Sequence, residues 1–313
     1  MPTRRDVLLQ PAAALLTATL LPRHAAAADA VASPPPGTVE ELAPRLWALR
    51  GCGGNVVVFH GGSDGVLLVD GGAAAHTATV LRTVRRLTGS DRVHTLFNTH
   101  WHWDQTGAND RLGAAGTRII AHENTRLWLG TDIVSKWESR SYPRLPKQAR
   151  PTVTTYTRDS LAFGGETIDY VHLPQAHTDS DLIVHFRGAD VIAAGDIAAH
   201  GQFPIIDFST NGWIGGLADA AKALVERSTD ATRIVPGHGS LMTRVQMQEE
   251  AAMLAEMRQR LARLLTQGLS AQELVDKRPA QDYEAAWGDP TLFIRNAWPG
   301  LVHRARELGV SIV

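Results

Sequence analysis

The sequence predicts an α/β fold built from short buried strands and amphipathic helices. Apolar runs at 55–59 and 66–69 indicate two strands, and Val80, Leu81, Val84 and Leu87 after them have helical spacing. Another apolar run, 93–97, ends directly before a polar cluster, and the carboxyl ends of strands are where α/β sheets hold their ligands. The 313 residues suffice for one large domain with an extension.

The N-terminus has the features of a twin-arginine export signal. Arg4 and Arg5 precede an apolar run at 11–21, and small residues follow at 25–28. The run is shorter than the roughly 20 residues that a membrane span needs, which favours a cleaved signal over an anchor. We predict a Tat-type signal peptide at 1–28, a Pro-rich linker at 29–38 and a periplasmic or secreted protein.

The composition favours a soluble enzyme that acts on a small molecule. The net charge is −1, so nothing in the charge balance indicates nucleic-acid binding or, after signal cleavage, membrane binding. Cys52 is the only cysteine, which excludes an intrachain disulfide. The oligomeric state is left open.

The remaining elements follow in order along the chain. The runs at 55–59 and 66–69 flank a Gly-rich turn and predict a hairpin, and Gly89 is a suitable end for the helix after it. Further strands are expected at 117–121, 152–157, 167–173, 182–186, 191–194 and 233–235, with a helix at 213–224. From residue 241 the pattern is helical: Ser270 and Glu273 form a capping box, and Pro299 is expected to interrupt the last helix.

The polar cluster after the run at 93–97 has the residue types of a metal site. His100, His102 and Asp104 alternate in sequence, so on a strand or its extension they would point the same way. Two imidazoles and a carboxylate suit a divalent metal, zinc first. The competing interpretation is three solvated residues in a loop.

Three more potential ligands come directly after predicted strands. They are His177, Asp196 and His238, each beside Gly or Pro or a short turn. Singly, each is better explained as a turn residue. Together with the cluster at 100–104 they could line one rim of a sheet.

In order and spacing, these four motifs resemble the metallo-β-lactamase superfamily of zinc hydrolases, over about 39–240. The resemblance implies an αββα sandwich of two facing mixed sheets flanked by helices, here with a helical extension at 241–313. The alternation of strands and helices alone does not distinguish this fold from a doubly wound sheet. The extension is interpreted as packing on the sandwich, with a lid or dimer contact as the alternative.

The resemblance also implies the roles of the site residues. His100, His102 and His177 would hold a first zinc, Asp104 and His238 would belong to a second site, and Asp196 would bridge both. Asp70, at the end of its predicted strand, matches the family's acid that orients a ligand histidine, although a turn residue is an equal alternative. Orientation of this kind fixes the tautomer of a ligand.

Two departures from the family pattern bear on function. Gln105 stands where the family commonly has another histidine, and an amide oxygen is a poorer zinc ligand. We therefore expect one tight zinc and a weaker second one, with Gln105 at best a weak ligand. No lysine closely follows Asp196 to hold a substrate carboxylate, so a β-lactam is possible but not favoured.

The function implied is an exported zinc hydrolase in which metal-bound hydroxide attacks an acyl carbon of an ester, thioester, lactone or lactam. Asp104 would orient the nucleophile and pass a proton to the leaving group. Of the two tryptophans between the ligands, Trp101 and Trp103, at least one is expected to pack inside. His200 could contact substrate, although a surface histidine is favoured. The alternative function is a non-hydrolytic metal-binding or redox accessory protein with a degraded second site.

Overall fold

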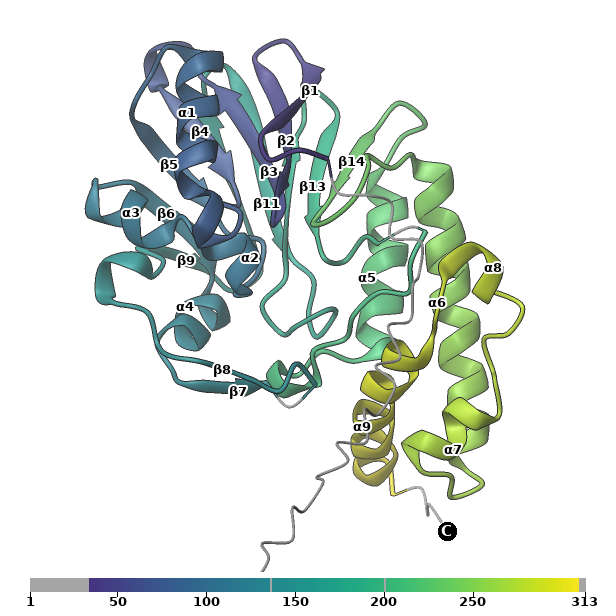
Figure 1. The fold of residues 1–313 in the computed structure, drawn as a ribbon. Helices are drawn as coiled ribbons and strands as arrows, with labels where there is room; N and C mark the ends of the chain where they lie inside the picture. The colour runs from purple at the N-terminus through teal and green to yellow at the C-terminus, as the bar shows by residue number, and fades with distance from the viewer. Residues whose placement is uncertain (1–33, 136, 200, 310–313) are drawn as a thin grey trace, which may run out of the picture.

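The computed structural model describes residues 34–135, 137–199 and 201–309, which form two β-sheets packed face to face with helices outside (Figure 1). The predicted αββα sandwich is confirmed. The predicted signal peptide at 1–28 and the first part of the linker lie outside the described residues.

The first sheet has seven strands in the order β1-β2-β3-β4-β5-β6-β9. They are β1 (Thr38–Ala43), β2 (Leu46–Cys52), β3 (Gly54–His60), β4 (Val66–Val69), β5 (Val93–Phe97), β6 (Arg118–His122) and β9 (Val153–Thr155). The predicted hairpin is the antiparallel pair β3–β4. From β4 to β9 the pairs are parallel, so β4, β5 and β6 end at the same edge.

The second sheet has five strands in the order β10-β11-β12-β13-β14. They are β10 (Arg158–Phe163), β11 (Glu166–His172), β12 (Leu182–Phe186), β13 (Val191–Gly195) and β14 (Arg233–Pro236). Only β13–β14 is parallel, and the carboxyl ends of these two strands carry the next residues, Asp196 and His238, to the same edge. A separate two-stranded hairpin consists of β7 (Ile133–Ser135) and β8 (Arg140–Tyr142).

One hydrophobic core lies between the two sheets. Alternate residues of the first sheet, such as Val57, Phe59 and Phe97, face residues of the second sheet, such as Tyr170 and Phe186. The Phe59 and Phe186 rings meet edge to face with their centroids 5.7 Å apart. Burial of this apolar surface removes it from water and holds the two sheets together.

Helices cover the outer face of each sheet (Figure 1). On the first sheet these include α1 (Thr77–Thr88), α2 (Trp103–Thr106), α3 (Asn109–Ala114) and α4 (Glu123–Leu129). Gly89 adopts a left-handed conformation (φ 73°) and ends α1, as the sequence predicts. On the second sheet, α5 (Ile214–Arg227) and α6 (Arg244–Leu265) pack in one shared core.

The C-terminal helices continue this outer layer. They are α7 (Ala271–Asp276), α8 (Glu284–Trp287) and α9 (Thr291–Glu307), and Ser270 and Glu273 form the predicted capping box of α7. The expected interruption at Pro299 was wrong, because α9 runs through it. Buried contacts of Phe293 and Leu301 on either side offset the lost backbone hydrogen bond. Within the described ranges, no helix is long and apolar enough to cross a bilayer.

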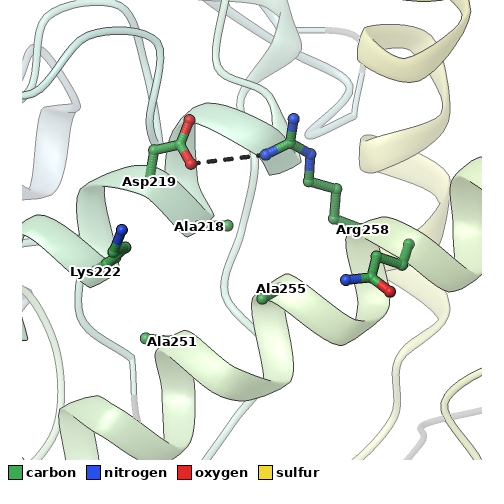
Figure 2. Close-up of a pocket in the computed structure, with 7 residues that line it drawn as sticks. Ala218, Asp219, Lys222, Ala251, Ala255 and Arg258 are labelled. Atoms are coloured by element: carbon green, nitrogen blue, oxygen red, sulfur yellow. Dashed lines mark ion pairs between the residues drawn. The ribbon is translucent and has the colours of Figure 1, made fainter.

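A hollow of about 440 Å³ lies on the outer surface between α5 and α6, and Figure 2 shows the residues that line it. Its floor is made of alanines that let the helices approach closely, and the ion pair between Asp219 and Arg258 (3.6 Å) closes one end. None of its lining residues belongs to the polar cluster at the sheet edge.

Candidate metal centre

Three imidazoles and a carboxylate converge at the edge where strands of both sheets end. The donor atoms of His100, His102, His177 and Asp196 all lie within 4.8 Å of one another. His102 Nδ1 and His177 Nε2 are 3.0 Å apart, and Asp196 Oδ2 is 3.7 Å from His100 Nε2 and 3.5 Å from His177 Nε2. All three imidazoles are buried.

The outer nitrogen of each imidazole has a hydrogen-bond acceptor. His100 Nδ1 lies 3.1 Å from Thr99 Oγ1, His102 Nε2 lies 3.2 Å from Asp207 Oδ2, and His177 Nδ1 lies 2.8 Å from the Ile205 carbonyl. Since the outer nitrogens are the donors, the inner nitrogens of neutral rings carry lone pairs. Three lone pairs that face one another without a proton between them fit a cation.

Burial and the neighbouring imidazoles hold the pKa of His100 well below its usual value. Burial likewise lowers the pKa of His177. Burial also acts to lower the pKa of His102, but the hydrogen bond and charge of Asp207 outweigh it and the net shift is upward. Two of the three rings are therefore biased toward the neutral form that binds a metal.

A second group of polar side chains adjoins the first. His238 Nε2 lies 3.0 Å from Asp104 Oδ2, 3.8 Å from Asp196 Oδ1 and 3.4 Å from Gln105 Nε2. Asp196 therefore touches both groups. Although burial opposes it, the charges of Asp196 and Asp104 raise the pKa of His238 to about 9.

Several buried polar atoms at this place have no hydrogen-bond partner among the described residues. They are His100 Nε2, Asp104 Oδ1, Gln105 Oε1 and Asp196 Oδ1. A buried acceptor without a donor costs about 1–3 kcal/mol, and four gathered at one place would be a large penalty in a site without a ligand. A cation coordinated by these atoms would remove it, so the residues fit a metal.

The loop after β5 sets the positions of His100 and His102. We expected the strand or its extension to align His100, His102 and Asp104, and this was wrong. The strand ends at Phe97 and the helix α2 begins at Trp103, so Asp104 lies on a helix, where it pairs with His238 and is not part of the group of His100, His102 and His177. The change from strand to helix alters the direction of successive side chains.

Glycines let the two loops from the second sheet approach closely. A Cβ at Gly237 would lie 1.8 Å from Asp196 Oδ1, and one at Gly195 (φ 55°) would lie 2.7 Å from Thr99 Oγ1. Asn55 holds the loop that carries His238 by donating to the carbonyls of Pro236 (2.9 Å) and Gly239 (3.0 Å).

A family model described as the metallo-beta-lactamase superfamily matches residues 49–238, more than half of the chain. The chain belongs to the metallo-beta-lactamase superfamily.

Solved structures with this fold include lactamases and a sulfatase. A metallo-beta-lactamase from Pontibacter korlensis is 17% identical, covers 70% of this chain and 98% of its own, and has a TM-score of 0.55. BLEG-1, a B3 metallo-beta-lactamase, is 20% identical, covers 65% of this chain and 95% of its own, and has a TM-score of 0.54. The sec-alkylsulfatase Pisa1 from Pseudomonas sp. is 15% identical over 88% of this chain and 51% of its own, with a TM-score of 0.65. The present chain thus spans about half of the sulfatase.

The predicted enzyme class, a metal-dependent hydrolase of this superfamily, is confirmed by the family match and the His/Asp cluster. The predicted ligands on the metallo-beta-lactamase fold all lie at this sheet edge, with His100, His102 and His177 in one group and Asp104 and His238 in the other. His200 lies outside the described residues.

Asp70 contacts the polar cluster indirectly, through Thr99. It accepts hydrogen bonds from the backbone N–H and the Oγ1 of Thr99, both 2.8 Å long, and Thr99 Oγ1 faces His100. Within the described part of the chain, Asp70 therefore does not contact a histidine directly, as expected for an orienting acid, but holds Thr99, which contacts His100. Its positive φ (61°) turns the side chain toward that residue.

Sequence reasoning missed Asp207. This buried carboxylate accepts from His102, from Thr210 Oγ1 (2.7 Å), from Ser209 N–H (3.0 Å) and from Trp137 Nε1 (3.2 Å). Burial opposes the shift, but the hydrogen bond from His102 leads the effects that lower the pKa of Asp207 to about 2. The only signal in the sequence was an Asp before Phe-Ser-Thr, which is typical of a helix cap.

The β7–β8 hairpin adjoins the site. Trp101 is buried, as expected for at least one of the two tryptophans, and its ring contacts Tyr142 of β8 (centroids 5.4 Å apart) and His102 (4.5 Å). Trp103 is 39% exposed. Through Trp137 the hairpin also reaches Asp207, so it is tied to the metal centre at two points.

Proposed function

We propose that the protein is an exported zinc hydrolase that cleaves an acyl bond in a small ester, thioester, lactone or lactam. The observation that carries this proposal is the set of three buried imidazoles whose outer nitrogens are fixed and whose inner nitrogens face one another. In catalytic zinc sites, three protein ligands leave the fourth coordination position of the metal open for water or substrate.

Zinc held by His100, His102 and His177 would supply an electrophile for the scissile carbonyl and lower the pKa of water to about 7. The chain's own residues handle the protons. Asp104 has one carboxylate oxygen without a donor, Oδ1, and the other is held by His238. We assign to Asp104 the orientation of the attacking water and the transfer of a proton to the leaving group.

The second metal position is proposed to be weaker than the first. Its donors would be Asp104, Asp196 and His238, with Gln105 contributing an amide oxygen in place of an imidazole. The unpartnered Oε1 of Gln105 is available for this contact. One tight and one weaker zinc per chain is the expected stoichiometry.

Sulfate-ester hydrolysis is a second candidate. The sulfatase likeness covers 88% of this chain, whereas the lactamases cover 65–72%, so it extends over more of the chain than the lactamase fold does. The C-terminal helices account for the part of the described chain beyond residue 240. Alkyl sulfates therefore belong in the first substrate panel.

Metal content by mass spectrometry, on protein without its signal and beside a His102→Ala variant, tests the proposal. About one or two zinc per chain, lost in the variant together with activity on the panel, is the expected result. No bound zinc after reconstitution would overturn it. Fractionation of cells that carry Arg4→Lys with Arg5→Lys tests export, and the protein should then remain in the cytoplasm.

A further inference from the structure

We propose that Arg140 and Trp103 form an anion-binding rim beside the metal centre, which selects substrates that carry a carboxylate or sulfate group. This inference rests on the proposed function, because it names the substrate class of the same site. The rim is defined as the Arg140 guanidinium together with the exposed face of Trp103.

The guanidinium is held by aromatic rings. Arg140 Cζ lies 4.6 Å from the centroid of the Trp103 ring and 4.9 Å from that of Tyr142. Contacts of this kind hold a cation over the negative face of a ring. These two contacts place the guanidinium of the exposed Arg140 beside Trp103 and Tyr142.

The same rings fix the rim relative to the metal ligands. Trp103 stands between His102 and Asp104 in the chain. Tyr142 packs against Trp101, which in turn packs against His102. The Tyr142 hydroxyl donates to Glu138 (2.7 Å), and Trp137 donates to Asp207. The hairpin, which Figure 1 shows extending from α4 toward the segment before α5, is thus connected to His102 through two neighbours, Trp101 and Asp207.

The edges of the guanidinium remain available. Among the residues that the structure describes, no carboxylate forms an ion pair with Arg140, although other arginines, such as Arg126 and Arg260, are paired. Nor does the Arg140 side chain donate a hydrogen bond to any other described residue, so its N–H groups are free to donate to a ligand. These groups match the two oxygens of a carboxylate or sulfate.

This position explains how the chain could bind an anionic substrate without a lysine after Asp196. A charged substrate group beside the reacting bond would meet Arg140 on the hairpin. Binding energy at such a group can be used to orient the scissile bond at the metal centre.

Matched substrates test the rim in zinc-loaded enzyme. We would compare mono-4-nitrophenyl pimelate, whose carboxylate is too far from the ester for rapid intramolecular cleavage, with its neutral methyl ester, and include hexyl sulfate, in which the anionic group itself is cleaved. For whichever anionic substrate the enzyme cleaves, Arg140→Gln should raise KM by about 10-fold or more and leave kcat little changed. The KM for the neutral ester should stay the same. Arg140→Lys should give an intermediate loss, and Arg144→Gln, at an exposed arginine on the same segment, should match the wild type.

Binding of hexanesulfonate, measured by calorimetry, separates this inference from the proposed function. If no substrate were cleaved but hexanesulfonate bound about 10-fold more weakly to Arg140→Gln, the rim would stand and the hydrolase proposal would fail. Equal KM ratios and equal sulfonate binding in Arg140→Gln and the wild type would overturn the rim, even in an active hydrolase.

Discussion

Asp207 orients His102, one of the three clustered imidazoles, through a direct hydrogen bond. Its carboxylate fixes the outer nitrogen of His102 and so directs the inner nitrogen toward the other imidazoles. The carboxylate also accepts hydrogen bonds from Ser209, Thr210 and Trp137, and these restrict its orientation. Partners of this kind commonly affect metal affinity by 10–100-fold.

Replacing Asp207 with Asn should therefore weaken binding of the proposed first zinc by about 10–100-fold, because the amide keeps the shape of the carboxylate but loses the charge that favours donation by His102. Competition with a fluorescent chelator measures the affinity. Asp219→Asn, at an exposed carboxylate on α5, is the control and should leave it unchanged. An unaltered affinity in Asp207→Asn would contradict this role.

Replacing Gln105 with His should strengthen the weaker zinc site. The side chain is buried beside His238, and its carboxamide lies against the backbone of Gly54, where any Cβ would collide with it. An imidazole of similar size offers a better zinc donor than an amide oxygen. Zinc titration by calorimetry should show the second binding step move to higher affinity, and two equal tight sites in the native protein would contradict the argument.

How well the sequence predicts a site residue depends on whether that residue belongs to a recognisable motif. His100, His177 and His238 follow strand ends in fixed contexts, and the structure brings them to one sheet edge. Asp207 lies in a loop far from the motifs and meets His102 only after folding, across 105 positions of sequence. No local pattern encodes such a pairing, and the same holds for Asn55.

At the scale of elements, α6 is connected to the loop after Asp196 by a buried carboxylate. Glu250 accepts the Ala199 N–H with both oxygens, 3.0 Å each, and is fully buried. Burial raises its pKa from 4.5 to about 8, and the hydrogen bond offsets only part of this effect. At neutral pH the folded chain therefore retains a proton that the unfolded chain has released.

The free energy of unfolding should consequently fall as the pH rises from about 4.5 to about 8, where the folded chain binds more protons than the unfolded one. The contribution of Glu250 is complete below pH 4.5 and is lost above pH 8. Glu250→Gln should make this slope shallower without abolishing it, because burial also raises the pKa of Asp70 to about 8, and it should stabilise the protein at pH 8–9 by an amount on the order of a few kcal/mol. Urea unfolding across the pH range measures it, with the exposed Glu226→Gln as control; parallel wild-type and Glu250→Gln curves would refute it.

Pro299 lies inside α9, which shows why the ends of helices cannot be predicted from local sequence preferences alone. A proline inside a helix costs about 3 kcal/mol, which predicts a break there. In the folded chain, α9 has buried residues on both sides of Pro299, and Gly300 lies so close to Trp213 that a Cβ would approach its Cβ to 2.8 Å. Tertiary packing that the sequence does not reveal outweighs the local preference.

At the scale of the whole molecule, the metal centre joins the two sheets. His100 and His102 follow a strand of the first sheet, whereas His177 and Asp196 follow strands of the second. A cation bound by all four would link both halves of the sandwich. Ligands that bind only the folded state stabilise it by about 4 kcal/mol when present at about 1,000 times their dissociation constant.

Removal of metal with a chelator should therefore lower Tm by about 10 °C, and added zinc should restore it. Differential scanning calorimetry measures the shift. His102→Ala, which lacks a ligand, should respond to neither treatment. A wild-type Tm that is independent of chelator and zinc would contradict a link between the sheets.

The sandwich itself followed from the resemblance more than from periodicity. Strand and helix positions such as 93–97 and 182–186 were predictable because apolar runs are local signals. The partition into two facing sheets depends on which strands pair, and β9 and β10 are adjacent in the chain yet belong to different sheets. The pairing of strands that are far apart in the chain cannot be predicted from a short window of sequence.

The distribution of the ligands along the chain also has a kinetic consequence. His102 pairs with His177 across 75 positions, and Gln105 meets His238 across 133. Contacts between such distant segments form slowly, because the intervening chain must first be ordered. A partly synthesised chain that ends before residue 238 lacks one donor of the second group. Capture of zinc by the full set of donors, if the proposed function holds, would therefore report that synthesis and folding are complete, and its rate would be limited by the slowest folding step.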